Sequence, residues 1–202
     1  DSIVSPDPIL STIFVANVGH SNKKIISYLK TVLDKPLLSC YAYGNQIRAE
    51  YLKKLIKFAG NGFEKAFLLS AGTEATEAAL KLMRLNAQKL DKRKRGIICF
   101  EGNWHGRTLG AQLMSNNKSQ KDWIGFNDQD IHFLPFPYPW EIHNNDSINL
   151  LYKNIDKLVS NGINLKKDIA GFMLETFQGW GAVFYPKSFV ENIKKICIDN
   201  DL

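Results

Sequence analysis

The chain has 202 residues, of which 45% are hydrophobic and 23% are charged, and its formal net charge is +6. These values are typical of a globular protein that buries a core of its own. No apolar run approaches the length of a membrane span, and the first residues lack the basic-then-apolar pattern of a secretion signal. Composition therefore predicts one globular domain, or one large domain with an appendage, and no association with a membrane is expected.

The cysteines and the charges restrict the compartment and the partners. Cys40, Cys99 and Cys197 are odd in number and far apart, which favours free thiols in a reducing compartment such as the cytoplasm. The four histidines show no ligand spacing with these cysteines, so no metal site is expected. The densest basic cluster, residues 89–95, follows a predicted helix end, where cations suit the helix dipole. This favours a solvated helix end over a nucleic-acid surface.

The first 45 residues form a predicted arm followed by a helix. Pro6 and Pro8 indicate an irregular arm, and Ser21 is the expected N-cap of a helix that ends before Pro36. The residues expected to face inward from this helix are Ile25, Ile26, Leu29, Val32 and Leu33.

A second helix is predicted over residues 46–59, and residues 46–202 are expected to form one partial large domain. Gly60 is the natural terminator of the helix. Its expected apolar stripe consists of Ile47, Tyr51, Leu55 and Phe58.

From residue 66 onward the pattern alternates between strands and helices. Strands are predicted at residues 66–69, 97–100, 131–134 and 169–174, and helices from about Thr73, over 147–159 and over 187–198. The inward face of the helix that begins near Thr73 is expected to carry Ala75, Ala78, Ala79, Leu82 and Leu85. Strand, helix and strand at this spacing predict a right-handed parallel crossover and an α/β fold.

The segment from Ser70 to Thr73 is a candidate anion site. It lies between a predicted strand and a predicted helix, so several unpaired N–H groups point at one place with the positive end of the helix dipole. Gly72 has no Cβ to obstruct a bulky phosphate, and Thr73 offers a hydroxyl. The alternative is an ordinary turn with Thr73 as N-cap. The segment has neither a P-loop nor a dinucleotide fingerprint.

Two further loops follow predicted strands, at residues 101–107 and 175–181. In an open α/β sheet, ligands bind outside the carboxyl ends of the strands, so these loops and residues 70–73 are expected to face one crevice. That crevice offers an anion cradle, an aromatic ring with an imidazole, and a carboxylate.

The motif from Ser70 to Ala75, followed about thirty residues later by residues 104–108 (Trp-His-Gly-Arg-Thr), resembles the class III aminotransferases. These are pyridoxal-phosphate enzymes of fold type I, and they include the ornithine and 4-aminobutyrate transaminases. Gly19-His20 and the segment Glu175 to Gly181 add to the resemblance, which covers roughly residues 13–202. It implies an α/β fold, namely an incomplete three-layer αβα large domain of the fold type I enzymes.

The resemblance implies that pyridoxal 5'-phosphate is the cofactor and that its phosphate lies at Ala71, Gly72 and Thr73, where the N–H groups of Gly72 and Thr73 hold it. Trp104 stands where relatives usually carry a phenylalanine against the pyridine ring; the alternative is a core aromatic under a loop. His105 is a further cofactor-binding candidate, although it could equally satisfy a loop carbonyl.

Glu175 and Gln178 match relatives that read Glu-Pro-Ile/Val-Gln-Gly-Glu-Gly, and Glu175 is expected to brace the cofactor-side network. The alternative for Glu175 is a strand-end carboxylate that caps a neighbouring turn. Trp180 replaces the second glutamate, which in ornithine- and aminobutyrate-type enzymes pairs with an arginine. Because tryptophan cannot form that charge pair, the amino donor is expected to be neither ornithine nor 4-aminobutyrate. Tyr43 and Trp180 are the substrate-contact candidates, and packing on a neighbouring helix is the alternative for Tyr43.

The implied function is transfer of an amino group between an amine or amino acid and a 2-oxo acid, in a homodimer. The family's cofactor-pairing aspartate and Schiff-base lysine lie in later strands than those found here, so the 202 residues alone are expected to be inactive. The alternatives are an aminomutase of the same fold and a non-catalytic binding or structural domain.

Overall fold

A computed structural model describes residues 18–33, 44–91, 93–140 and 146–202. The chain divides into two compact units, one within residues 1–66 and one within residues 67–202. The division predicted after residue 45 stays a prediction. None of the described helices combines the length and apolar character that a membrane span requires.

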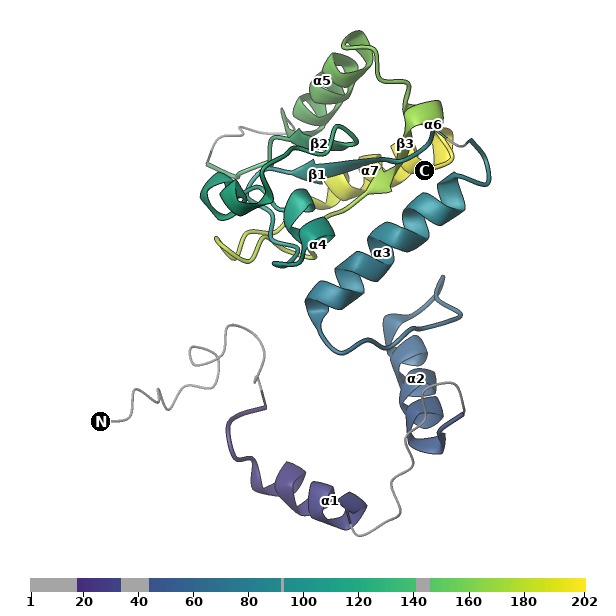
Figure 1. Cartoon of the computed structure of the whole chain (residues 1–202), viewed down its shortest axis with the longest axis vertical. Helices are drawn as coiled ribbons and strands as arrows, with labels where there is room; N and C mark the ends of the chain where they lie inside the picture. Colours follow the sequence, from purple (N-terminus) through teal and green to yellow (C-terminus); the bar gives the residue numbers. More distant parts are fainter. Residues whose placement is uncertain (1–17, 34–43, 92, 141–145) are drawn as a thin grey trace, which may run out of the picture. The chain divides into compact units, whose positions relative to one another are not determined.

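The described residues of the first unit form two helices, α1 (Lys23–Leu33) and α2 (Gln46–Ala59) (Figure 1). The side-chain oxygen of Asn22 accepts hydrogen bonds from the N–H groups of Lys24 and Ile25, at 3.0 and 3.4 Å. The expected cap Ser21 instead has a φ of 53°, so the prediction for the start of α1 was wrong by one residue. An amide oxygen one residue nearer the helix reaches the free N–H groups better.

The boundaries predicted for α2 are confirmed. Asn45 accepts a hydrogen bond from the N–H of Arg48, and Gly60 ends the helix with a φ of 85° while its N–H donates to Ile56. Only glycine adopts such a backbone conformation without strain, which explains why the helix ends there.

Neither helix buries the apolar stripe that its period predicts. Most of the stripe side chains of α1 and α2 are exposed, and no residue of either helix is fully buried. The exposed ones are Ile25, Ile26, Leu29, Leu33, Ile47, Tyr51 and Phe58. The 3.6-residue period identified both helices, but the prediction that their apolar stripes face inward was wrong. An apolar stripe is buried only where another segment packs against it.

The second unit is a sheet covered on both faces by helices (Figure 1). Its elements are α3 (Gly72–Ala87), β1 (Gly96–Phe100), α4 (Leu109–Met114), the 3-10 turns η1 (Lys118–Gln120) and η2 (Asp122–Ile124), β2 (Ile131–Leu134), α5 (Asp146–Ser160), α6 (Leu165–Asp168), β3 (Ile169–Phe172) and α7 (Lys187–Asp199). The described strands are parallel, in the order β2-β1-β3. In β1 and β2, Ile97 pairs with Ile131 and Phe100 with Leu134.

The two faces of β1 build two cores. Ile98 and Phe100 pack with α5 and α7, whereas Ile97 and Cys99 pack with α3 and with Met114 of α4. Because successive strand residues point to opposite faces, a strand buried on both sides must be apolar throughout, as β1 is. The α/β class and the partial three-layer αβα architecture of the prediction are confirmed.

Two predictions about the start of this unit were wrong. Residues 66–69 form no strand, and Phe67, Leu68 and Leu69 are exposed. An apolar run becomes a strand only beside a hydrogen-bonded neighbour, and the described strands pair only with one another.

The packed face of α3 also differs from the predicted one. Ala79, Leu80 and Met83 contact the sheet core, with Ala87 buried, whereas Leu82 and Leu85 are exposed. Ala75 is exposed as well. The helix carries apolar residues on more than one side, so periodicity alone could not select the side that the sheet covers.

Candidate active site

The start of α3 has no side-chain cap on its N-cap residue. Its N-cap residue Ala71 is extended and makes no side-chain capping bond, and the carboxylate of Glu74 accepts the N–H of Ser70 at 2.9 Å. A Cβ added to Gly72 would meet nothing within 4 Å. Because α3 runs for 16 residues, its first-turn N–H groups carry the positive end of a full helix dipole.

The loop after β1 lies directly against α3. Gly106 has a φ of 132°, and a Cβ added there would lie 2.5 Å from the Oγ1 atom of Thr73. The hydroxyl of Thr76 is 2.7 Å from the carbonyl oxygen of His105. The close approach that glycine permits therefore holds this loop beside the first turns of α3, where the anion site is predicted.

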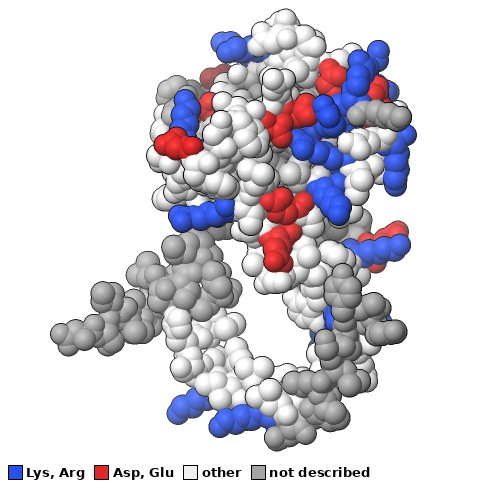
Figure 2. Space-filling view, viewed as in Figure 1, with Lys and Arg blue, Asp and Glu red and all other residues white. Residues whose placement is uncertain are grey.

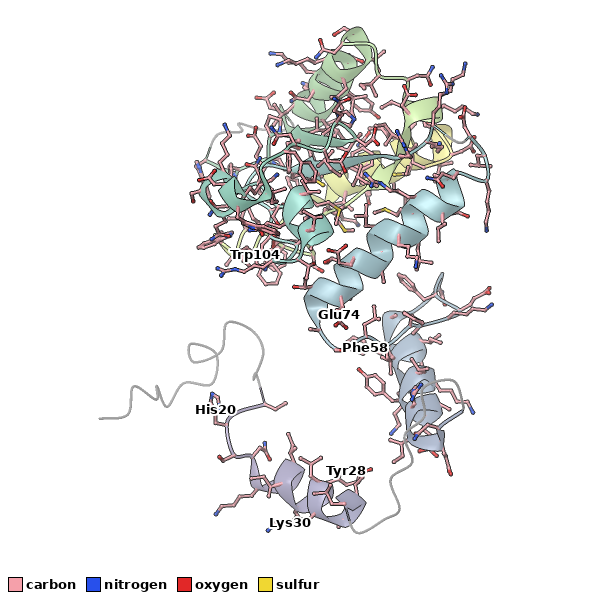
Figure 3. The ribbon with its side chains drawn as sticks, in the orientation of Figure 1. His20, Tyr28, Lys30, Phe58, Glu74 and Trp104 are labelled. Carbon is pink, nitrogen blue, oxygen red and sulfur yellow. The ribbon has the colours of Figure 1, made fainter. Side chains whose placement is uncertain are left out.

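Trp104 occupies the centre of that loop and is half-buried (Figure 3). Its backbone N–H donates to the carboxylate of Glu175. Its ring meets Trp180 edge-on, with centroids 6.3 Å apart, and the guanidinium of Arg107 lies 5.4 Å from its centroid. Two side chains thus contact the indole of Trp104, Arg107 from its own loop and Trp180 from the loop after β3, and Glu175 fixes its backbone.

Glu175 and Gln178 connect the loop after β3 to the loop after β1. Besides Trp104, the Glu175 carboxylate accepts the N–H of Gly179 at 2.7 Å, and the side chain of Gln178 donates to the carbonyl of Glu101 at 2.9 Å. Burial raises the pKa of Glu175, and the two backbone hydrogen bonds oppose that rise. Glu175 therefore links the loops after β1 and β3, and the loop after β1 also contacts α3; a role of Glu175 in bracing a cofactor stays a prediction.

His105 points its ring into the loop rather than toward the open start of α3. The side chain is 4% exposed, and its Nε2 atom is 3.3 Å from the amide nitrogen of Asn103. Burial lowers the pKa of His105 to about 4, so the imidazole is neutral at neutral pH. The hydroxyl of Tyr185 in turn donates to Asn103 at 3.2 Å, which closes a buried polar network.

A cavity of about 270 Å³ lies beside Trp180. The other residues that line it are Gly102, Asn103, Asn116, Asn117 and Lys118. Trp180 itself is 66% exposed, so one side of its ring is free for a ligand. Sequence reasoning missed Asn116 and Lys118, although the polar run after the Trp-His-Gly-Arg-Thr motif was the available signal.

The other predicted site residues are placed as follows. Ala71, Gly72 and Thr73 form the start of α3, and Tyr43 lies outside the described residues. Within the described ranges, no group of three or more His, Cys, Asp or Glu side chains could hold a metal ion.

Comparison with known proteins places the chain in a family. The family model for class III aminotransferases matches residues 8–202. The chain is 34% identical over 197 residues to the mitochondrial acetylornithine aminotransferase of Candida glabrata, covering 94% of this chain and 42% of that protein. It is 28% identical over 198 residues to an ornithine aminotransferase of Brevibacillus brevis, covering 96% and 44% respectively.

Solved structures share the fold. A taurine:2-oxoglutarate aminotransferase from Bifidobacterium kashiwanohense, in complex with PLP and glutamate, has a TM-score of 0.79 at 19% identity and covers 92% of this chain and 42% of that one. An omega transaminase from Pseudomonas jessenii, in complex with PMP, has a TM-score of 0.78 at 20% identity, with 91% and 42% covered. The chain spans less than half the length of these relatives. By the match over residues 8–202, it belongs to the class III aminotransferase family.

Proposed function

We propose that the protein containing this chain transfers an amino group between an amine or amino acid and a 2-oxo acid, with pyridoxal phosphate as cofactor. The observation that supports this most is the convergence of the open start of α3, the ring of Trp104 and the carboxylate of Glu175. A phosphate needs N–H donors, and a flat pyridine needs a stacking face. The residues present fit both requirements.

Each residue has a role in this proposal. The N–H groups of Gly72 and Thr73 hold the phosphate beside Ala71, and the indole of Trp104 stacks on the cofactor ring. Glu175 and Gln178 position the loops rather than react, since their polar atoms are hydrogen-bonded to backbone groups. His105 acts in the same way, from within the buried network. The bound cofactor would supply the electron-accepting ring that carries the amino group.

The cavity at Trp180 is the proposed substrate side. A 2-oxo acid carries a carboxylate, and Lys118 is the cation among the residues that line this cavity. The indole of Trp180 contributes apolar surface there and cannot pair with an arginine. This favours an amino donor other than ornithine or 4-aminobutyrate, with Tyr43 as a second substrate contact.

The test is cofactor binding by the protein that contains residues 1–202. Pyridoxal phosphate should produce a bound-cofactor absorbance band and raise the melting temperature, with a stabilisation of roughly 2.7 kcal/mol at a hundredfold excess over the dissociation constant. An amino donor should then convert the bound cofactor to its amine form and release a keto product.

Gly72→Val should remove most of this stabilisation, because a branched side chain would enter the open space beside the first turn. The control Arg93→Ala changes a cation outside the three loops and should leave it intact. An equal loss of stabilisation in both variants would mean that a basic protein attracts the phosphate diffusely. If the cofactor did not raise the melting temperature of the unmodified protein, the proposal would be overturned.

We also propose a homodimer in the cytoplasm. The exposed apolar side chains of α1 and α2 need a cover, and the described cysteines, Cys99 and Cys197, are free thiols. Sedimentation should show a dimer, and a monomer that melts cooperatively would contradict this assembly. A fluorescent fusion that localised to an organelle would contradict the compartment.

A further inference from the structure

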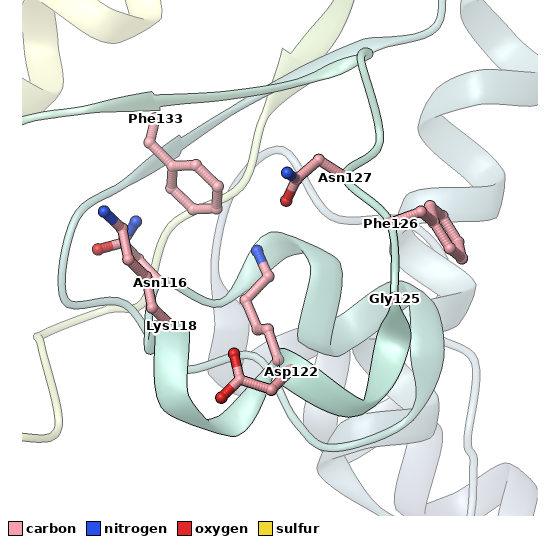
Figure 4. Close-up of a pocket in the computed structure, with 8 residues that line it drawn as sticks. Asn116, Lys118, Asp122, Gly125, Phe126, Asn127 and Phe133 are labelled. Atoms are coloured by element: carbon pink, nitrogen blue, oxygen red, sulfur yellow. The ribbon is translucent and has the colours of Figure 1, made fainter.

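A second cavity, of about 440 Å³, lies between β2 and the turns η1 and η2 (Figure 4). It is lined by Asn116, Lys118, Lys121, Asp122, Gly125, Phe126, Asn127 and Phe133. Figure 4 shows the Phe133 ring and the Asn127 amide pointing into the space, whereas Phe126 points away from it. It adjoins the cavity at Trp180, because Asn116 and Lys118 line both.

Lys121 places a poorly compensated positive charge at this cavity. Its side chain is half-buried, and its ammonium donates one hydrogen bond, to the carbonyl of Leu113 at 2.9 Å. The ammonium lies 4.9 Å from the centre of the Phe133 ring. Among the described residues, no carboxylate lies within ion-pair distance of Lys121, although Asp122 also lines the cavity.

This arrangement leaves the ammonium short of partners. An ammonium group has three donors, and burial of an unpaired charge is costly, which is why burial lowers the pKa of Lys121. A purely structural role, as a cap for the last carbonyls of α4 and a cation–π partner of Phe133, uses one of the three ammonium donors. An anion in the cavity would compensate the charge more completely.

The walls indicate which anion fits. The amides of Asn116 and Asn127 supply neutral donors, Lys118 supplies a second cation, and Phe133 supplies a flat apolar face. A volume of about 440 Å³ is within the range of small-molecule sites. A bare inorganic ion would use the cations and leave the ring face uncovered.

We infer that the cavity between β2 and η1–η2 binds a small organic carboxylate with a flat, unsaturated face, anchored by Lys121 and stacked on Phe133. None of the residues that line the cavity belongs to the proposed cofactor cradle at α3, although Asn116 and Lys118 also line the proposed substrate cavity. The inference does not depend on the aminotransferase proposal.

The test measures benzoate binding by calorimetry to the protein that contains residues 1–202, with inorganic phosphate as a second probe. Lys121→Met removes the charge but keeps the aliphatic stem, and it should weaken benzoate binding about tenfold or more, as expected for loss of a charge-assisted hydrogen bond. Phe133→Leu should weaken benzoate binding but not phosphate binding. Lys157→Met on the distant helix α5 is the matched control and should have no effect.

Several results would contradict the inference. No benzoate binding at concentrations up to tens of millimolar, or an unchanged affinity in Lys121→Met, would overturn the inference. Should Lys121→Met fail to fold, Lys118→Glu replaces the second cation of the cavity, at its exposed rim, with a negative charge and should abolish benzoate binding. Phosphate that binds as tightly as benzoate would also overturn it, because the flat face would then contribute nothing. Cofactor absorbance should be the same in Lys121→Met and the unmodified protein, so failure here is distinguishable from failure of the proposed function.

Discussion

Individual side chains at the candidate site serve mostly to hold loops together. Glu175 and Gln178 each connect two loops that are more than seventy residues apart in sequence. His105 belongs to a buried network with Asn103 and Tyr185. The ligand-facing surface is therefore left to backbone N–H groups and indole rings, which the polar network positions.

The neutral imidazole of His105 should make stability depend on pH. Its pKa is about 4 in the folded protein, against an ordinary value of 6.5, because burial disfavours its charged form. Between these values the unfolded chain binds a proton that the folded protein does not, so stability is retained above pH 6.5 and lost as the pH falls toward 4.

The free energy of unfolding that is lost through His105 should approach about 3 kcal/mol, because each unit of pKa difference corresponds to about 1.4 kcal/mol. Urea unfolding at several pH values, compared between the unmodified protein and His105→Gln, separates the contribution of His105 from that of the titrating carboxylates. Parallel pH profiles for the two proteins would show that the imidazole does not titrate in this way.

Glu175→Gln should weaken the contact between the loops after β1 and β3. The amide has one oxygen to replace two carboxylate oxygens, so either Trp104 or Gly179 would face an NH₂ donor. We expect a loss of about 1–3 kcal/mol in unfolding free energy, together with weaker cofactor binding. Glu191→Gln is the matched control, since Glu191 is exposed and forms only a surface ion pair with Lys187 at 3.7 Å. An equal effect in both variants would contradict the bracing role.

At the scale of elements, the approach of the loop after β1 to α3 sets the geometry of the site. The contact depends on Gly106, whose positive φ and missing Cβ let the loop lie against Thr73. The open start of α3 depends on Gly72, which has ordinary backbone angles and empty space beside it. Two glycines therefore meet opposite requirements within one site.

Gly106→Ala and Gly72→Ala should consequently have opposite effects on stability. Gly106→Ala combines a strained φ with a Cβ placed 2.5 Å from Thr73, so we expect a loss of about 1–3 kcal/mol. Gly72→Ala meets no neighbour and improves helix propensity, with a gain of up to about 1 kcal/mol. Chemical denaturation of both variants measures the difference, and a stabilised Gly106→Ala would show that the loop does not rest on α3.

At the scale of the second unit, buried charge joins segments that are distant in sequence. Lys94 is fully buried, and its ammonium donates to the carbonyls of Lys166 and Asn200, both at 2.9 Å. It belongs to the basic cluster 89–95 that composition placed at a solvated helix end, so that expectation was wrong for Lys94. On the face of this unit that Figure 2 shows, Lys and Arg are interspersed with Asp and Glu.

Lys94→Met should therefore destabilise the whole second unit. It would leave the partly exposed carbonyls of Lys166 and Asn200 without this donor, at a total cost of about 1–3 kcal/mol. Lys195→Met changes an exposed lysine of α7 and should stay within about 0.5 kcal/mol. Thermal unfolding of the two variants compares them, and similar melting temperatures would mean that solvent reaches the Lys94 site.

The sequence alone determined the three strands and the helices α5 and α7 within residues 96–202, the start of α3, the end of α2 at Gly60 and the family resemblance. It gave no indication of the short helices α4 and α6. These features depend on local causes, such as apolar runs, caps, glycine conformation and a motif pair. Tertiary structure decided which side of α3 is buried, that residues 66–69 have no strand partner, and that Lys94 is inside. It also turned His105 into the loop network and brought Lys118 beside Trp180. These features depend on which segment, distant in sequence, packs against a given side chain, and local periodicity does not indicate which segment that is.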